Sequence, residues 1–125
     1  MLVAPAPNFD LLRVAPRALG IAFALFLSLF ALDVFETPAG FVDTAIALLI
    51  HLVPTFVLLA TVAVAWRREW IGALVFGALG VAYVAFVRGF PIATYVVIAG
   101  PALATAALYL AAWRRRRRTQ RSDRP

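Results

Sequence analysis

Two ionisable side chains lie within long apolar stretches of this sequence. Asp33 stands two positions before Phe35, near the end of the first stretch, and His51 stands eight positions after Asp43, inside the second. A charged group at the midplane of a bilayer costs roughly 2.5–3.5 kcal/mol, so an ionisable residue in a membrane span is a candidate functional residue. An imidazole that titrates near neutral pH beside a carboxylate would make a proton or cation site.

The spacing allows these two side chains to meet. At about 1.5 Å per helical residue, Asp33 lies about 3 Å and His51 about 12 Å from the same edge of the membrane. Helical side chains lean toward the N-terminus of their helix, so in antiparallel helices the two lean toward each other. A structural role is nevertheless favoured. Asp33 can reach headgroup water, and His51 shares a helix face with Thr44 and Thr55, where it can hydrogen-bond across helices.

Arg88 is the one basic residue expected on the same side of the membrane as Asp33. Arg88 should lie at a depth in the bilayer similar to that of Glu36, Asp43 and Asp33. A surface ion pair, or an anchor whose head snorkels to the bilayer edge, is favoured over an anion-binding role. The candidate intramembrane polar site therefore consists of Asp33, His51, Thr55 and Arg88.

Two prolines each interrupt an apolar stretch near its middle. Pro54 and Pro101 lie about 16 Å and 15 Å into their spans. Each removes the helical hydrogen bond to the carbonyl four residues earlier, at Ile50 and Val97. Paired interruptions can form substrate sites in transporters, but kinks whose carbonyls bond nearby hydroxyls are the simpler use. We predict helix kinks at both prolines.

The residues that common enzymes need are scarce. The chain has no cysteine, one histidine, and two serines at Ser28 and Ser122. This composition excludes thiolate zinc sites, iron–sulfur clusters and cysteine nucleophiles, and one histidine cannot supply the paired histidines of common zinc or haem sites. Neither a glycine-rich phosphate loop nor an HExxH motif is present. We expect a protein that is not an enzyme and has no cofactor or metal site.

Four apolar stretches carry these residues. Of the 125 residues, 64% are hydrophobic and 14% are charged, whereas soluble domains are about 45–50% apolar and about 25% charged. A bilayer core of about 30 Å needs about 20 apolar residues in a helix, with about 17 as the minimum. Four stretches qualify, at residues 18–35, 44–66, 70–87 and 92–113. The prediction is an all-α, up-down bundle of four transmembrane helices with short connections.

Polar segments flank the predicted membrane domain at residues 18–113. Residues 1–17 are expected to form a cytoplasmic, interfacial segment, with a short helical turn over residues 9–14 that Pro16 limits. Residues 114–125 are expected to form a basic, disordered cytoplasmic tail. Its run of five arginines can set the topology, bind anionic lipid headgroups or dock an acidic partner, and the first of these is the default. The run consists of Arg114, Arg115, Arg116, Arg117 and Arg118.

The distribution of arginine predicts the orientation. All twelve basic residues are arginine, and eleven lie in the N-terminal segment, the second connection or the tail. Cytoplasmic segments carry the excess of basic residues, so both termini are predicted to be cytoplasmic in a multi-pass protein of the bacterial inner membrane. Trp66, Trp70 and Trp113 fall on the same side, where indoles anchor at headgroup level. Because the arginines flank apolar runs, we expect no nucleic-acid partner.

Three short motifs stand out in the first three spans. They are Leu29-Phe30-Ala31-Leu32-Asp33-Val34-Phe35, His51-Leu52-Val53-Pro54-Thr55 and Trp66-Arg67-Arg68-Glu69-Trp70-Ile71-Gly72. Together they resemble an uncharacterised family of small four-span prokaryotic membrane proteins. An aromatic residue is expected in that family where Arg68 stands, so the third motif matches in part. The resemblance implies four helices and no known activity, so it assigns no catalytic residue.

These observations favour a non-enzymatic membrane protein that acts as a scaffold, an accessory subunit or a membrane-homeostasis factor. Its expected partners are the lipid bilayer, anionic lipid headgroups, and either a second copy or another membrane protein. Small residues at Gly72, Gly77 and Gly80 allow close helix contact, within the chain or between copies. The alternative is a small proton-coupled or ion-conducting transporter that uses Asp33 and His51.

Overall fold

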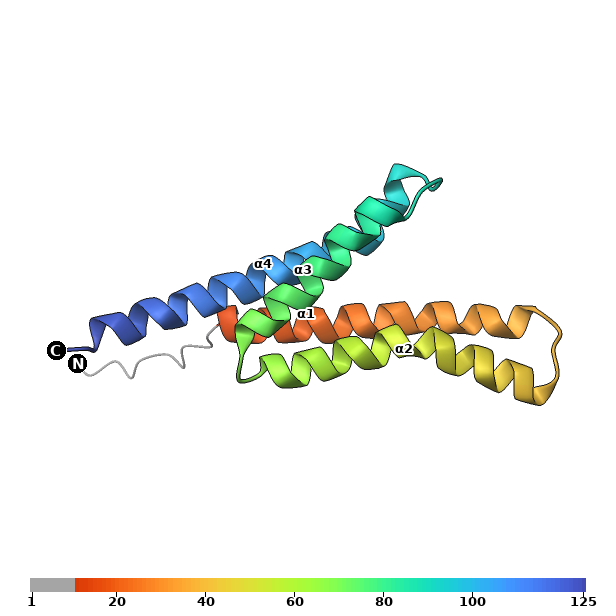
Figure 1. The fold of residues 1–125 in the computed structure, drawn as a ribbon, viewed down its shortest axis with the longest axis horizontal. Coiled ribbons are helices and arrows are strands. Elements are labelled where there is room, and N and C mark those ends of the chain that lie inside the picture. Colours follow the sequence, from red (N-terminus) through yellow and green to blue (C-terminus); the bar gives the residue numbers. More distant parts are fainter. Residues whose placement is uncertain (1–10) are drawn as a thin grey trace, which may run out of the picture.

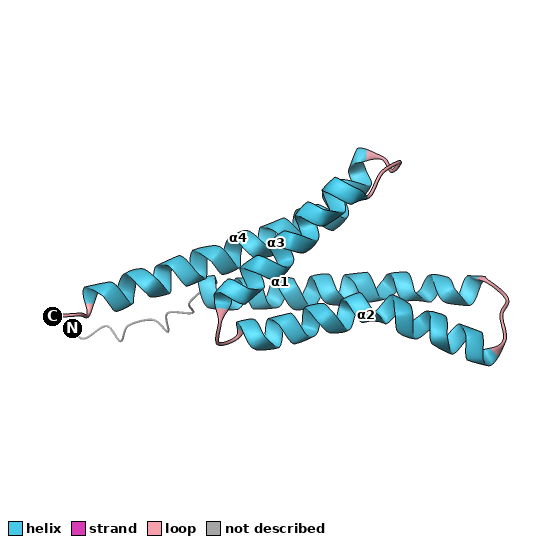
Figure 2. Ribbon diagram, viewed as in Figure 1, coloured by secondary structure: helices cyan, strands magenta, loops and turns pink. Residues whose placement is uncertain are grey.

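A computed structural model of the protein describes residues 11–125, and all of its regular elements are helical (Figure 1). They are α1 (Leu11–Ser28), the 3₁₀ helix η1 (Leu29–Glu36), α2 (Phe41–Ala65), α3 (Glu69–Phe86) and α4 (Ile92–Ser122). The connections are short (Figure 2). With α1 and η1 taken together, four helices are long and apolar enough to cross a membrane. The predicted all-α fold with four apolar helices is confirmed.

The four helices form a ring in chain order. Each packs against the next, and α1 also packs against α4, while the contact between α3 and α4 is the most extensive. Figure 1 shows two hairpins, α1–α2 and α3–α4, that cross near the connection between α2 and α3 and spread apart toward their other ends. We call the end with the α2–α3 connection the basic end and the opposite end the splayed end.

The hydrophobic core lies where the two hairpins meet. Every α-helix contributes to it, through Phe23, Ala24, Leu58, Val62, Ala65, Phe76, Ala102 and Tyr109. Gly20 lets α1 approach this core closely, because a Cβ atom built there would lie 2.9 Å from Val62 Cγ2 and 3.2 Å from Phe76 Cζ. Such close packing without side-chain bulk is the usual role of small residues in membrane-type bundles.

Two glycines of α3 let α4 pack directly against its backbone. A Cβ atom at Gly72 would lie 2.6–2.8 Å from the Tyr109 ring, and one at Gly80 would lie 2.7 Å from Leu103. The close helix contact expected from these glycines is therefore made within the chain. The connection that follows α3 turns at Gly89, whose φ of 87° is a conformation that glycine adopts without steric cost.

The first span differs from the uniform helix expected over residues 18–35. It is already α-helical at Leu11, the first described residue, and it changes from α-helix to 3₁₀ helix at Leu29. The change follows Ser28, whose hydroxyl donates to the Leu25 carbonyl three residues earlier, a local bond that competes with the α-helical pattern. A 3₁₀ helix rises about 2.0 Å per residue, so this segment is longer and thinner than an α-helix of the same sequence.

Both polar flanks are more helical than expected. Helix α1 runs through Pro16 instead of stopping before it. Pro16 cannot donate to the Leu12 carbonyl, so the helix continues at the cost of one backbone hydrogen bond. The expected turn at residues 9–14 lies partly outside the described residues. At the other end, the prediction of a disordered tail is wrong, because α4 continues to Ser122. Arginine is a good helix former, and a helix that is already nucleated extends at low cost.

Candidate functional site

An acidic pocket lies at the splayed end between η1 and α2. It has a volume of about 370 Å³ and contains both Asp33 and His51. The remaining lining residues are Val34, Thr37, Ala39, Asp43, Thr44 and Ala47. The two ionisable residues singled out in the sequence thus share one cavity, together with a second carboxylate from Asp43.

Asp33 and His51 do not bond directly to each other. His51 Nδ1 lies 2.8 Å from the Ala47 carbonyl, and because a carbonyl only accepts, Nδ1 is the donor. The other ring nitrogen, Nε2, is then an acceptor when the ring is neutral. The bond that His51 makes is within its own helix, whereas the sequence suggested a bond across helices.

The other two residues of the predicted polar site lie elsewhere. Thr55 is buried, and its hydroxyl donates to the Ala24 carbonyl of α1 at 3.2 Å, so it joins α1 to α2. Arg88 is exposed in the α3–α4 connection, on the other hairpin. Figure 1 shows this connection far from the turn that leads into α2. The structure therefore brings Asp33 and His51 together without Thr55 or Arg88.

A second cavity, the interhairpin groove, opens between the hairpins. It has a volume of about 380 Å³, and its lining is predominantly apolar. The lining residues are Leu27, Phe30, Ile50, His51, Pro54, Leu79, Tyr83 and Ile98. His51 lines both this groove and the acidic pocket, so it stands where the two cavities adjoin.

The two predicted kink residues face different grooves. Pro54 lies inside α2 and lines the interhairpin groove. Pro101 lines an apolar groove of about 380 Å³ between α1 and α4. Since Pro54 has no N–H, the helical hydrogen bond to the Ile50 carbonyl is missing, and Ile50 also lines the interhairpin groove.

A network of arginines organises the basic end. Arg17 of α1 donates from Nη2 to the Trp66 carbonyl at 3.0 Å, and its Cζ atom lies 4.0 Å from the centre of the Trp66 ring. Arg117 of α4 lies in the same way over Trp113, at 4.5 Å. A guanidinium over an indole face is a favourable cation–π contact. The contact of Arg17 with Trp66 joins α1 to the C-terminal end of α2.

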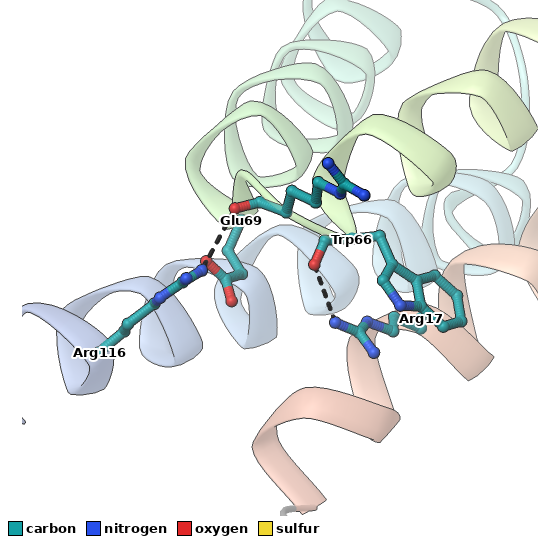
Figure 3. Close-up of polar contacts among 5 residues, drawn as sticks. Arg17, Trp66, Glu69 and Arg116 are labelled. Carbon is teal, nitrogen blue, oxygen red and sulfur yellow. Dashed lines mark hydrogen bonds and ion pairs between the residues drawn. The ribbon is translucent and has the colours of Figure 1, made fainter.

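Glu69, the first residue of α3, is the buried acid of this network (Figure 3). Its Oε2 atom lies 3.4 Å from Nη1 of Arg116, which also donates to the Arg67 carbonyl at 3.2 Å. The Glu69 side chain is only 9% exposed, against 48% for Arg116. Arg116 therefore binds both the α2–α3 connection, at the Arg67 carbonyl, and the first residue of α3, Glu69.

The sequence reasoning singled out neither Glu69 nor Tyr109. Glu69 is the only acidic residue between Trp66 and Trp70, and residues 114–118, much later in the sequence, are all arginine. A single acid together with such a basic segment points to an ion pair. Tyr109 had no such signal. Its ring lies under Gly72, and its hydroxyl is buried without a hydrogen-bond partner among residues 11–125.

The three sites differ in the chemical groups that they offer. Among the described residues no group of three His, Asp or Glu side chains is arranged to hold a metal ion. The acidic pocket offers carboxylates and an imidazole, the interhairpin groove offers apolar surface with few polar atoms, and the basic end offers guanidinium groups.

Comparison with known proteins places the chain in a family. Searches of the curated proteins and of the solved structures found no match. A model of one protein family matches residues 6–121, which is nearly the whole chain. The chain belongs to that family, which is described as a domain of unknown function, DUF7670.

Proposed function

We propose that the protein is a four-span membrane protein, with its basic end in the cytoplasm, that binds a transmembrane helix of a partner protein in the interhairpin groove. It would act as a non-enzymatic scaffold or accessory subunit. The observation that carries this proposal is the groove itself, an apolar cavity between two hairpins that are packed together at one end and separate at the other.

Membrane placement is supported by the surface of the helices. Large apolar side chains are exposed along all four of them, among them Leu49, Phe56, Leu74 and Val96. In water such a surface would drive aggregation, whereas hydrocarbon solvates it. The concentration of arginine at one end supports a cytoplasmic location for that end. The resemblance in sequence supports a prokaryotic inner membrane.

A protein helix fits the groove better than a lipid chain because of the polar atoms in its wall. His51 Nε2 and the Tyr83 hydroxyl have no hydrogen-bond partner among the described residues, and Pro54 leaves the Ile50 carbonyl without its helical donor. Unpaired polar atoms at membrane depth are costly. An acyl chain cannot satisfy them, whereas a helix that carries a Ser, Thr, Asn or Gln side chain can donate to the acceptors.

Site-specific photocrosslinking in native membranes tests this proposal. A photoreactive phenylalanine analogue at Leu79 would sit in the groove, and the same analogue at Val81 would sit on the exposed surface of the same helix. We expect the Leu79 probe to form a protein adduct whose crosslinked peptide is a transmembrane segment with a hydroxyl or amide side chain. His51→Leu should reduce the adduct about tenfold, the loss expected from about 1.4 kcal/mol of hydrogen bonding.

The control and the contradicting results are specific. The Val81 probe should give lipid adducts with no protein band. Lipid adducts alone at Leu79, an adduct with a second copy of the chain, or an adduct that His51→Leu leaves unchanged would each contradict the proposed partner.

A proton-coupled transporter is the second candidate, because Asp33 and His51 share the acidic pocket and His51 also reaches the groove. The packed core, which includes Leu58, Val62 and Phe76, lies between these cavities and the basic end. It favours a binding role over conduction across the whole bundle. Transport predicts a pH-driven flux in proteoliposomes that Asp33→Asn and His51→Ala both abolish, while the scaffold predicts no such flux.

A further inference from the structure

A further cavity, the tryptophan cavity, lies between α3 and α4 at the basic end. Its volume is about 530 Å³, which is within the ~300–1,000 Å³ of typical ligand pockets. Its lining residues are Trp70, Ala73 and Leu74 of α3, and Leu110, Trp113 and Arg117 of α4. No described residue of α1 or α2 lines it, so this cavity is separate from the interhairpin groove.

The polar side-chain groups of this cavity are all hydrogen-bond donors. The indole Nε1–H groups of Trp70 and Trp113 can only donate, and the guanidinium of Arg117 has five N–H donors and no acceptor. Within residues 11–125 none of these groups has a hydrogen-bond or ion-pair partner, and the Cζ atom of Arg117 lies 4.5 Å from the centre of the Trp113 ring. A ligand that satisfies these donors must present acceptor oxygens, and phosphate presents them in the planar, two-bond geometry that arginine prefers.

The charge around Arg117 favours an anion. Glu69, the acid next to the α3 wall of the cavity, is buried and already paired with Arg116. Arg114 and Arg121 lie about one turn before and after Arg117 on the same side of α4, and neither has an ion-pair partner in the described part of the chain. A zwitterionic ligand would have to place its own cation among these guanidinium groups, whereas an anion would not.

The apolar half of the cavity favours a lipid as the source of the phosphate. Leu74 and Leu110 are 62% and 37% exposed, and each lies about one turn further from the basic end than the tryptophan of its own helix. Interfacial tryptophans mark the headgroup level of a bilayer. A phosphate at that level therefore places an acyl chain along the two leucines, whereas a free phosphate ion would leave them uncovered.

We infer that the tryptophan cavity binds an anionic phospholipid, with the phosphate at Arg117 and the indole N–H groups and an acyl chain along Leu74 and Leu110. The helical tail makes this possible, because α4 continues to Ser122 and so holds Arg117 one turn beyond Trp113. A disordered tail would attract anionic lipids only diffusely. The inference rests on the membrane placement proposed above, but not on which partner fills the interhairpin groove.

Arg118 supplies the matched control. Arg117 and Arg118 are neighbours, both are exposed, and neither has a hydrogen-bond or ion-pair partner among the described residues, but only Arg117 lines the cavity. Arg117→Gln and Arg118→Gln therefore lose the same formal charge, and they differ in whether the cavity has lost its guanidinium. A diffuse electrostatic attraction would weaken equally in both.

Quenching of tryptophan fluorescence by brominated lipids measures the binding in a bilayer. The full chain is reconstituted into phosphatidylcholine vesicles that contain increasing fractions of phosphatidylglycerol or phosphatidylcholine brominated in the upper acyl chain. Bromine quenches on contact, and two of the three tryptophans of the chain line the cavity. We expect brominated phosphatidylglycerol to quench at about a tenfold lower fraction than brominated phosphatidylcholine. Arg117→Gln should reduce this preference about fivefold or more, and Arg118→Gln less than about twofold.

Several results would overturn the inference. They are an equal loss of preference in the two variants, quenching by brominated phosphatidylcholine as strong as that by brominated phosphatidylglycerol, and displacement of the lipid by an equal concentration of inorganic phosphate. Quenching by brominated phosphatidylcholine also reports insertion into the bilayer, so a chain outside the membrane is distinguished from an inserted chain without lipid preference. Because the crosslinking experiment probes the other end of the bundle, failure of lipid binding and failure of the proposed partner site are distinguishable.

Discussion

Replacing Gly72 with alanine should lower the stability of the bundle, although alanine is the better helix former. The new methyl group would lie 2.6–2.8 Å from the Tyr109 ring, and Tyr109 is only 1% exposed, so the ring has no space to move. Overpacking of this kind costs about 1–3 kcal/mol, which exceeds the gain of up to about 1 kcal/mol in helix propensity. The measurement is the midpoint of thermal unfolding in detergent, which should fall by several degrees.

Gly77→Ala is the matched control on the same helix. A methyl group there would lie 3.6 Å from the Ala106 Cβ, an ordinary contact. The gain in helix propensity from alanine should therefore remain, and the midpoint of thermal unfolding should stay unchanged or rise. If Gly72→Ala and Gly77→Ala shift the midpoint in the same direction and by the same amount, the close packing of α3 on the Tyr109 ring is wrong.

Removing Arg116 should destabilise the protein more than neutralising Glu69. Arg116→Gln leaves a carboxylate that is 9% exposed without its nearest cation, and an unsatisfied buried acceptor costs about 1–3 kcal/mol. Glu69→Gln leaves Arg116, which is half-exposed, to be solvated by water. That loss should resemble a surface ion pair, at most about 1 kcal/mol. Thermal unfolding of the two variants in the same detergent compares them directly.

The double variant Glu69→Gln/Arg116→Gln completes the comparison. With both charges gone, no buried charge is left unpaired, so its midpoint should lie above that of Arg116→Gln alone. A double variant as unstable as the sum of the two single variants would mean that the two side chains do not interact, and the anchoring of the tail on Glu69 would have to be abandoned.

The number and approximate extent of the helices follow from hydropathy, and the connections follow from the charged and Pro/Gly residues between them. Residues 44–66 and 70–87 were predicted as spans, and α2 and α3 cover Phe41–Ala65 and Glu69–Phe86. Hydropathy locates these helices because an apolar run of this length, without the alternation of a strand, favours a helix. It is insensitive to helix type, which is why the 3₁₀ segment η1 was not foreseen.

The site was predicted in part because local spacing fixes only local geometry. Asp33 and His51 belong to one hairpin and line one pocket. The antiparallel packing of the two helices, together with the tilt of helical side chains toward the N-terminus, was sufficient to predict this. Arg88 belongs to the other hairpin, and its position depends on the spread between the hairpins. That spread depends on contacts between the hairpins, such as Gly20 of α1 against Phe76 of α3, which are distant in sequence. The ion pair of Glu69 with Arg116 was missed for the same reason, since it needs a helical tail.

The central claim is that these helices cross a bilayer with the basic end in the cytoplasm, and thiol labelling in intact cells tests it most directly. The chain has no cysteine, so one introduced cysteine is its only thiol. Glu36→Cys and Phe90→Cys, at the splayed end, should react with a membrane-impermeant reagent in intact cells. Ser122→Cys should react only after permeabilisation. Labelling of Ser122→Cys in intact cells, or recovery of the labelled chains in the soluble fraction, would contradict the account.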